Sequence, residues 1–476
     1  MPAFSGEYRV VAIDLGGHGA SPADGEDRSI GSSGRDVAAV AAAVGADRIV
    51  LIGHSMGGLN RVDCQPQNEE AMRQFMRTVF MAFIPLALAS GAAARESAGP
   101  VMTLMIENGE MRGTGADAIR KKLEDAQFIL IGEDHGFAGP PQIAAAVARA
   151  AWPHGLRNHV VEVGPLATEW AGDILRRAGV DGLAAALEGR PLALPFLNLR
   201  EDAELADFFL HRGGRLWGVD QEFIGSPLIH LETLAGLAPS DAAGQKIEAL
   251  LQAEREAFAT GNQGAVYLFT ATKSDFDDLE TLFTGDSKAQ HIVRALRQSA
   301  SIYQAFGRGE NFRSNTDRIS LIKSQFLEQY RGVRGRAPRA LFKMGAIHLA
   351  RGTTFLNTFD IGSLIEGVAA ANGLGALRLL INPLEGTHTQ IRPSPDGVFS
   401  TVEYTSEEVA AIVGLAEIAR EDIPAEGWAV IPLEPLRLEL GQEGLNELSP
   451  ELRLWILGYD YLITTRGARP ATPLAD

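Results

Sequence analysis

The sequence predicts an α/β fold in which helices cover both faces of a mostly parallel sheet. Short apolar runs alternate with helical patterns from residue 127 onward, and several of these runs end at a glycine turn. The chain of 476 residues is 46% hydrophobic and 22% charged, which suits a large globular protein. Because this alternation is typical of parallel sheets, we predict a three-layer α/β/α domain.

The apolar runs that we interpret as strands follow one another at regular intervals. They are Phe128–Ile131, His159–Gly164, Arg215–Asp220, Ala340–Met344, Leu377–Ile381, Trp428–Pro432 and Tyr461–Thr465. A helix is predicted over about 141–151, and long helical patterns occupy roughly 240–261 and 274–330. The region of about 228–330 is therefore predicted to be a helical insertion between two strands.

The first sixty residues contain a serine motif of a different kind. A strand over about 8–15 leads into GGHGAS, an alanine-rich helix follows over about 33–44, and a second strand runs into HSMGG at 54–58. A G-x-S-x-G turn after a strand is typical of a nucleophile elbow, in which the next backbone N–H holds an oxyanion. This motif predicts Ser55 as a nucleophile and the amide of Met56 as the oxyanion donor.

The strings DLGGHGAS and IVLIGHSMGG closely resemble the α/β-hydrolase family over about residues 7–59. The resemblance implies two strands of that fold, the helix between them and the elbow. No later acid and histidine carry that family's local patterns, and a serine without a base is a weak nucleophile. We therefore expect residues 1–60 to be a truncated α/β-hydrolase fragment, with serine hydrolysis at Ser55 as a further alternative.

Residues 61–71 are predicted to be a polar linker, and residues 72–94 resemble a secretory signal peptide. Arg73 and Arg77 precede an apolar run over 78–88, and small residues follow at 92–94. The run is shorter than the roughly 20 residues that span a membrane, and Pro85 would break an interior helix. If the segment is cleaved, residues 95–476 are periplasmic or secreted without a membrane span. Otherwise, the protein is cytoplasmic or membrane-tethered.

Charge and cysteine content restrict the partners and cofactors. The net charge of −17 argues against a nucleic-acid binder, since phosphates would be repelled, so we expect a small-molecule substrate. The single cysteine, Cys64, precedes the main domain. That domain therefore forms no disulfide and no thiolate metal site.

Polar residues gather where the predicted strands end, which is where sites form in parallel sheets. Glu133 and His135 follow the first strand, Glu162 lies in the second, Asp220 ends the third, and His348 follows a later one. Because a charged glutamate is costly in an apolar strand, Glu162 either pairs with a cation or faces a wet cleft. A histidine beside carboxylates is a better proton acceptor. Asp220 either binds substrate or caps the next helix.

The strings ILIGEDHG, VVEVGP, GVDQE, NTDRISLIKSQFLEQY and LFKMGAIHLARG resemble the superfamily of erythromycin esterases, ChaN-type haem-binding lipoproteins and TIKI-type metalloproteases, over about residues 125–465. The resemblance implies two related halves with the site in the cleft between them and the insertion as a lid. It places Glu133, His135, Glu162 and His348 in the site, with Arg318 holding an anionic group of the substrate. The GEDH motif is nearer the ChaN and TIKI branches.

These observations predict an exported hydrolase of the erythromycin-esterase type. His135, oriented by Glu162 or Glu133, would deprotonate a water that attacks an ester, lactone or amide, while His348 or Arg318 stabilises the negative charge. One alternative is a ChaN-type protein that binds haem or another iron ligand without turnover. Another is a metal-dependent hydrolase, in which His135, His348 and Glu162 bind a divalent ion.

Overall fold

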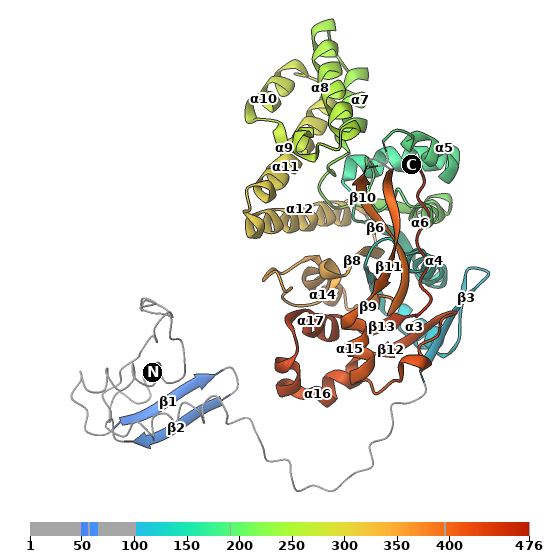
Figure 1. Cartoon of the computed structure of the whole chain (residues 1–476), viewed down its shortest axis with the longest axis vertical. Coiled ribbons are helices and arrows are strands. Elements are labelled where there is room, and N and C mark those ends of the chain that lie inside the picture. The colour runs from blue at the N-terminus through green and yellow to red at the C-terminus, as the bar shows by residue number, and fades with distance from the viewer. Residues whose placement is uncertain (1–48, 56–57, 65–100, 191, 395–396, 476) are drawn as a thin grey trace. The chain divides into compact units, whose positions relative to one another are not determined.

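The computed structural model describes residues 49–55, 58–64, 101–190, 192–394 and 397–475 (Figure 1). The chain divides into two compact units, Met1–Arg95 and Glu96–Asp476. Met56 and the signal-peptide-like segment 72–94 lie outside the described residues. No helix within the described ranges has the length and hydropathy needed to cross a membrane.

The first unit contains an antiparallel hairpin of β1 (Ile49–Ser55) and β2 (Gly58–Cys64), in which Ser55 is opposite Gly58. This arrangement differs from the prediction at two points. A nucleophile elbow joins a strand to a helix, whereas here a second strand follows the serine. Residues 61–64, predicted to begin a polar linker, are part of β2.

The second unit is built on a nine-stranded sheet with the order β4-β3-β12-β13-β9-β5-β8-β6-β7. The six strands from β13 to β7 run parallel, and the strands at the β4 edge pair antiparallel. The predicted mostly parallel sheet is therefore confirmed. Its strands are β3 (Met102–Glu107), β4 (Glu110–Arg112), β5 (Ala126–Glu133), β6 (Leu156–Val161), β7 (Arg215–Gly218), β8 (Arg339–Gly345), β9 (Gly375–Ile381), β12 (Trp428–Pro432) and β13 (Tyr461–Thr464).

Helices cover both faces of this sheet, so the predicted three-layer arrangement is confirmed. Successive residues of a strand point to opposite faces. In β5, Ile129 and Ile131 pack with α3 (Thr114–Leu123), α4 (Gly139–Ala151) and α6 (Arg200–His211). Phe128 and Leu130 lie in a separate core on the other face. The helices of that face are α12 (Asn311–Gly332), α14 (Ile361–Ala371), α15 (Glu407–Leu415), α16 (Leu433–Glu447) and α17 (Pro450–Gly458).

The predicted insertion is helical and has a core of its own. Its helices are α7 (Pro227–Gly236), α8 (Asp241–Ala259), α9 (Tyr267–Thr270), α10 (Lys273–Leu282) and α11 (Ser287–Gly307), and they lie together in Figure 1. The helical pattern over 274–330 is interrupted at Gly285 and Gly309, both with positive φ. Glycine adopts this conformation without strain and ends helices. The lid role of the insertion and the two related halves stay predictions.

Two further segments hold the loop after β5, which carries His135. The hairpin of β10 (Glu385–Ser394) and β11 (Gly397–Thr405) was not predicted, and the N–H of Thr389 donates to the carbonyl of Gly136 at 2.9 Å. Residues 468–474 bond to the same loop and to the start of α6. The remaining helices are α5 (Pro165–Leu187), α13 (Ala346–Leu349) and the short 3₁₀ turns Trp152–His154, Gln263–Ala265 and Arg420–Asp422.

Candidate active site

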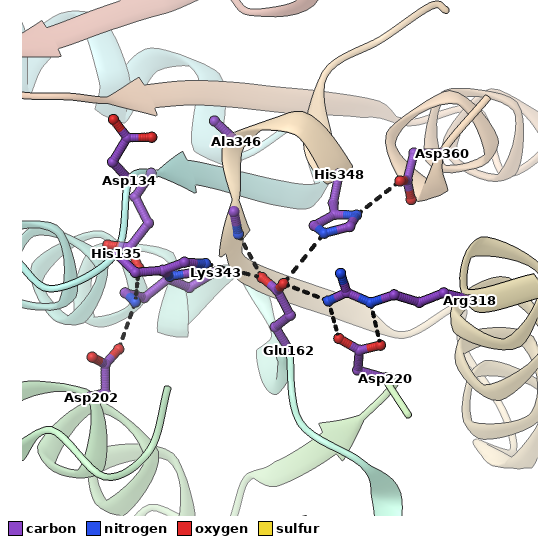
Figure 2. A network of polar contacts seen from close by, with 12 residues as sticks. Asp134, His135, Glu162, Asp202, Asp220, Arg318, Lys343, Ala346, His348 and Asp360 are labelled. Atoms are coloured by element: carbon purple, nitrogen blue, oxygen red, sulfur yellow. Dashed lines mark hydrogen bonds and ion pairs between the residues drawn. The ribbon is translucent and has the colours of Figure 1, made fainter. Parts of the chain in front are cut away.

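Glu162 lies at the centre of the candidate site (Figure 2). It follows β6 directly, rather than lying within the strand as predicted, and only 5% of it is exposed. Its Oε2 accepts the N–H of Gly345 at 2.6 Å, and its Oε1 lies 2.9 Å from Nη2 of Arg318 and 3.3 Å from Nε2 of His348. Burial opposes ionisation, but His348, His135 and Arg318 hold the pKa of Glu162 well below its usual value. Of the two alternatives predicted for Glu162, pairing with a cation is therefore the one observed.

Arg318 on α12 joins Glu162 to Asp220, which follows β7. Its Nε lies 2.9 Å from Oδ1 of Asp220, and its Nη2 contacts the other oxygen of that carboxylate. This is a bidentate pair, the geometry that a guanidinium favours. Helix α7 begins at Pro227 after Ser226, so the alternative that Asp220 caps the following helix is wrong.

His348 on α13 is held between two carboxylates. Its Nδ1 lies 2.8 Å from Oδ2 of Asp360, the residue before α14, and its Nε2 faces Glu162. Burial opposes the charged form, but Glu162 and Asp360 raise the pKa of His348 to about 10. At neutral pH its imidazole is therefore a cation and does not accept a proton.

His135 has one engaged and one less engaged ring nitrogen. Its Nδ1 lies 3.0 Å from Oε1 of Glu133, whereas its Nε2 is 3.5 Å from Oε2 of Glu162. The ring stacks on Phe196 at a centroid distance of 4.0 Å, and 30% of the side chain is exposed. Burial opposes protonation, yet Glu133 and Glu162 raise the pKa of His135 above its usual value. Since His348 is already charged, His135 is the histidine of this site that remains available as a base.

Gly345 ends β8 beside the ring of His135. A β-carbon at this residue would lie 3.2 Å from Nε2 of His135 and 3.6 Å from Oε2 of Glu162. The φ of Gly345 is −51°, which any residue adopts. The glycine therefore leaves one side of Nε2 open without being required for the backbone conformation.

A buried ion-pair network lies behind His135 and was missed in the sequence. The ammonium of Lys343 on β8 contacts Oε1 of Glu133 and lies 2.6 Å from Oδ1 of Asp202 on α6. Burial opposes ionisation of Glu133, but Lys343 and His135 hold its pKa below the usual value. The lysine within the apolar run LFKMG is a charged residue in a predicted strand, like Glu162, and could have indicated a buried ion pair. Asp202 and Asp360 gave no such signal, because acidic residues near helix starts are ordinary.

In the described structure, the residues proposed as metal ligands are paired with other protein groups. Among the described residues, no group of three or more His, Cys, Asp or Glu side chains is placed to hold one. The oxygens of Glu162 already face Arg318, the N–H of Gly345 and protonated His348. A divalent cation at this carboxylate would be repelled by two positive groups. Metal binding by His135, His348 and Glu162 stays a prediction.

The structure brings together six of the predicted site residues: Glu133, His135, Glu162, Asp220, Arg318 and His348. They come from the last residue of β5, from the segments that follow β5, β6, β7 and β8, and from α12. Ser55 lies in the first unit. The catalytic and substrate-binding roles of these residues stay predictions.

The fold and this network define an α/β domain with a polar site at the carboxyl ends of its parallel strands. Its structure is similar to that of a mutant erythromycin esterase, EreC, in its open conformation, with a TM-score of 0.52 and 11% identity over 78% of this chain and 98% of that one. The fold that the resemblance implied is thereby confirmed.

Other comparisons are more distant. A Bacillus cereus protein matches with a TM-score of 0.48 and 12% identity over 78% of this chain and 96% of that one. A succinoglycan biosynthesis protein matches with a TM-score of 0.45 and 11% identity over 75% and 91%. Residues 1–60 match the family of the α/β hydrolase fold, as predicted. A comparison with curated proteins by sequence gave no match.

Proposed function

We propose that this protein is a hydrolase in which His135 activates a water for attack on an ester, lactone or amide carbonyl. The observation that carries the proposal is the orientation of His135. Glu133 accepts the N–H of Nδ1, so the lone pair of a neutral imidazole is on Nε2, beside the side that Gly345 leaves open. A positioned histidine with a pKa near the working pH is an efficient general base.

In this reaction the water forms a bond to the carbonyl carbon while its proton passes to Nε2 of His135. The resulting imidazolium is stabilised by Glu133 and Glu162, which lie on either side of the ring. The negative charge that develops on the carbonyl oxygen needs a cationic donor. Figure 2 shows the third guanidinium nitrogen of Arg318 pointing away from Asp220, and this group is suited to that role.

Two further features support the proposal. The fold is shared with an erythromycin esterase, as described above. The site also combines a candidate base with buried cations that are each paired with carboxylates, in a protein of net charge −17, which suits a neutral small-molecule substrate. No cofactor is needed for the proposed step.

The test is hydrolysis of a panel of esters, lactones and amides by the full chain and by His135→Ala. We expect the variant to lose at least about 100-fold in kcat, since general bases contribute this much or more. His211→Ala is the matched control, because its side chain is 55% exposed and pairs with Asp207 on the surface of α6. Full activity of folded His135→Ala would overturn the assignment.

The alternative functions can be distinguished with the same preparation of the full chain. Haem binding without turnover would produce a Soret band after haem addition. Metal-dependent hydrolysis would be lost with a chelator and regained with a divalent ion. A fluorophosphonate probe would label Ser55 if it were an active nucleophile. For export, sequencing the N-terminus of protein from its native host should find a mature start near Arg95.

A further inference from the structure

Lys343 is buried in the middle of the sheet, where a lysine is unusual. It lies on β8, between β5 and β6, and its side chain is 4% exposed. Lysine is almost never fully buried unless its charge is paired. Replacing a buried ion pair by apolar residues is often neutral or stabilising, so stability does not by itself account for a lysine here.

The contacts of Lys343 lead directly to the proposed base. Its Nζ contacts Oε1 of Glu133, the same oxygen that accepts Nδ1 of His135 at 3.0 Å. The other oxygen of Glu133 is buried and has no hydrogen-bond partner among the described residues. Lys343 is therefore the contact that fixes the Glu133 carboxylate toward His135.

Asp202 fixes Lys343 from the opposite side. It is 5% exposed in the first turn of α6, with Oδ1 2.6 Å from the ammonium. The turn is itself anchored, because the N–H of Arg200 donates to the carbonyl of Thr472 at 2.7 Å and the N–H of Thr472 donates to Glu201 at 2.9 Å. The lysine is thus held between a rigid helix start and Glu133.

Apart from His135 itself, the ion pairs of the described residues give Glu133 and Asp202 only Lys343 as a cationic partner. His159 on β6 lies near Lys343, and burial together with the Lys343 charge lowers its pKa to about 3. It is therefore neutral in the working range. Glu162, Arg318 and His348 lie on the side of His135 away from Asp202 (Figure 2).

We propose that Lys343 and Asp202 are positioning residues of the hydrolytic site. Lys343 holds Glu133 so that it accepts the N–H of Nδ1 of His135 and leaves Nε2 as the proton acceptor, and Asp202 holds Lys343. The expected change in turnover rests on the proposed function, because it requires His135 to be the catalytic base. The expected effect of Lys343 and Asp202 on the tautomer of His135 does not depend on that function.

The test uses Asp202→Asn and Lys343→Met in the full chain, with Glu254→Gln as the control. Glu254 is another buried carboxylate, in the helical insertion, that accepts the N–H of Tyr267. ¹⁵N NMR of labelled imidazoles reports which nitrogen of His135 carries the proton, and kinetics on a substrate of the wild-type protein report kcat and KM. The His135 signal is assigned by its loss in His135→Gln.

We expect both site variants to move part of His135 to the tautomer protonated at Nε2 and to lower kcat about 10-fold or more, with KM within about twofold. The control should change neither. If Lys343→Met does not fold, Asp202→Asn, which keeps the shape of the side chain, still decides the question. An unchanged tautomer in folded Asp202→Asn overturns the proposal. Absence of turnover in the wild-type protein would instead overturn the proposed function.

Discussion

Gly345 and His135 lie so close together that a β-carbon on residue 345 would be 3.2 Å from Nε2 of the imidazole. Gly345→Ala is therefore a direct test of water access to the base. The backbone accepts alanine, so we expect little change in melting temperature but a fall of about 100-fold in kcat, because the methyl group blocks Nε2 or displaces the ring. Gly367→Ala on α14 is the control, since its β-carbon would contact nothing within 4 Å. Equal activity of both variants would exclude a water at this position.

The pH dependence of activity follows from the two histidines and, on the acid side, from Asp202, whose pKa burial raises to about 6. His135 acts as a base only when neutral, and its pKa is raised above the usual 6.5. We expect kcat/KM to increase with pH on the acid side, with a midpoint above 6.5, and to decrease near pH 10, where His348 loses its proton. A pH–rate profile between pH 5 and 10.5 measures both limbs. An acid limb below pH 6 would contradict the role of His135.

The stability of the protein should decrease in alkaline solution because of His348. Its pKa is raised from 6.5 to about 10 in the folded state, so the stabilisation is fully present below pH 6.5 and is lost as the pH rises toward 10. Each pKa unit corresponds to about 1.4 kcal/mol. Urea unfolding at pH 6.5 and 9.5 measures the loss. His348→Gln should reduce this pH dependence, and an unchanged dependence would argue against the pairing with Glu162 and Asp360.

The pairing of Arg318 with Glu162 and Asp220 predicts a large cost of removing the guanidinium. Arg318→Met leaves buried Asp220 without its cation and removes one of the cations that face Glu162, and breaking a buried pair typically destabilises a protein by about 3–5 kcal/mol. Arg313→Met on the same helix removes an arginine whose side chain is 62% exposed, and should cost less than about 1 kcal/mol. Denaturant unfolding at pH 7 measures the free energy of unfolding of both variants. A similar decrease in the two variants would contradict the buried network.

The loop that carries His135 requires glycine at residue 136 for two separable reasons. Gly136 has a φ of +94°, and a β-carbon there would be 2.1 Å from the carbonyl oxygen of Thr389. Gly309 also has a positive φ, but its β-carbon would contact nothing within 4 Å. Gly309→Ala should therefore cost only the backbone strain, about 1–2 kcal/mol, and Gly136→Ala distinctly more. Equal unfolding free energies would mean that β10 moves away easily.

The six parallel strands of the main sheet were predictable because parallel strands buried on both faces are continuous apolar runs. The strands β3 and β4 at its antiparallel edge were not predicted. Phe128–Ile131 and Leu377–Ile381 each lie within an observed strand, β5 and β9. The β10–β11 hairpin was not predicted. Its strands contain threonine, serine and glutamine on partly exposed faces, so no apolar run marks them.

The fold class, and the edge of the sheet at which the site forms, can be inferred from the amino-acid sequence alone. Parallel strands align their carboxyl ends, so residues at or just after those ends, such as Glu133 and Glu162, are brought to one edge of the sheet. The carboxylate that binds Nδ1 of His135 and the positive charge of His348 are known only from the folded structure. Protonation depends on charges within a few ångströms, and here those charges come from Lys343, Asp202 and Asp360, which the fold brings together from β8, α6 and the start of α14.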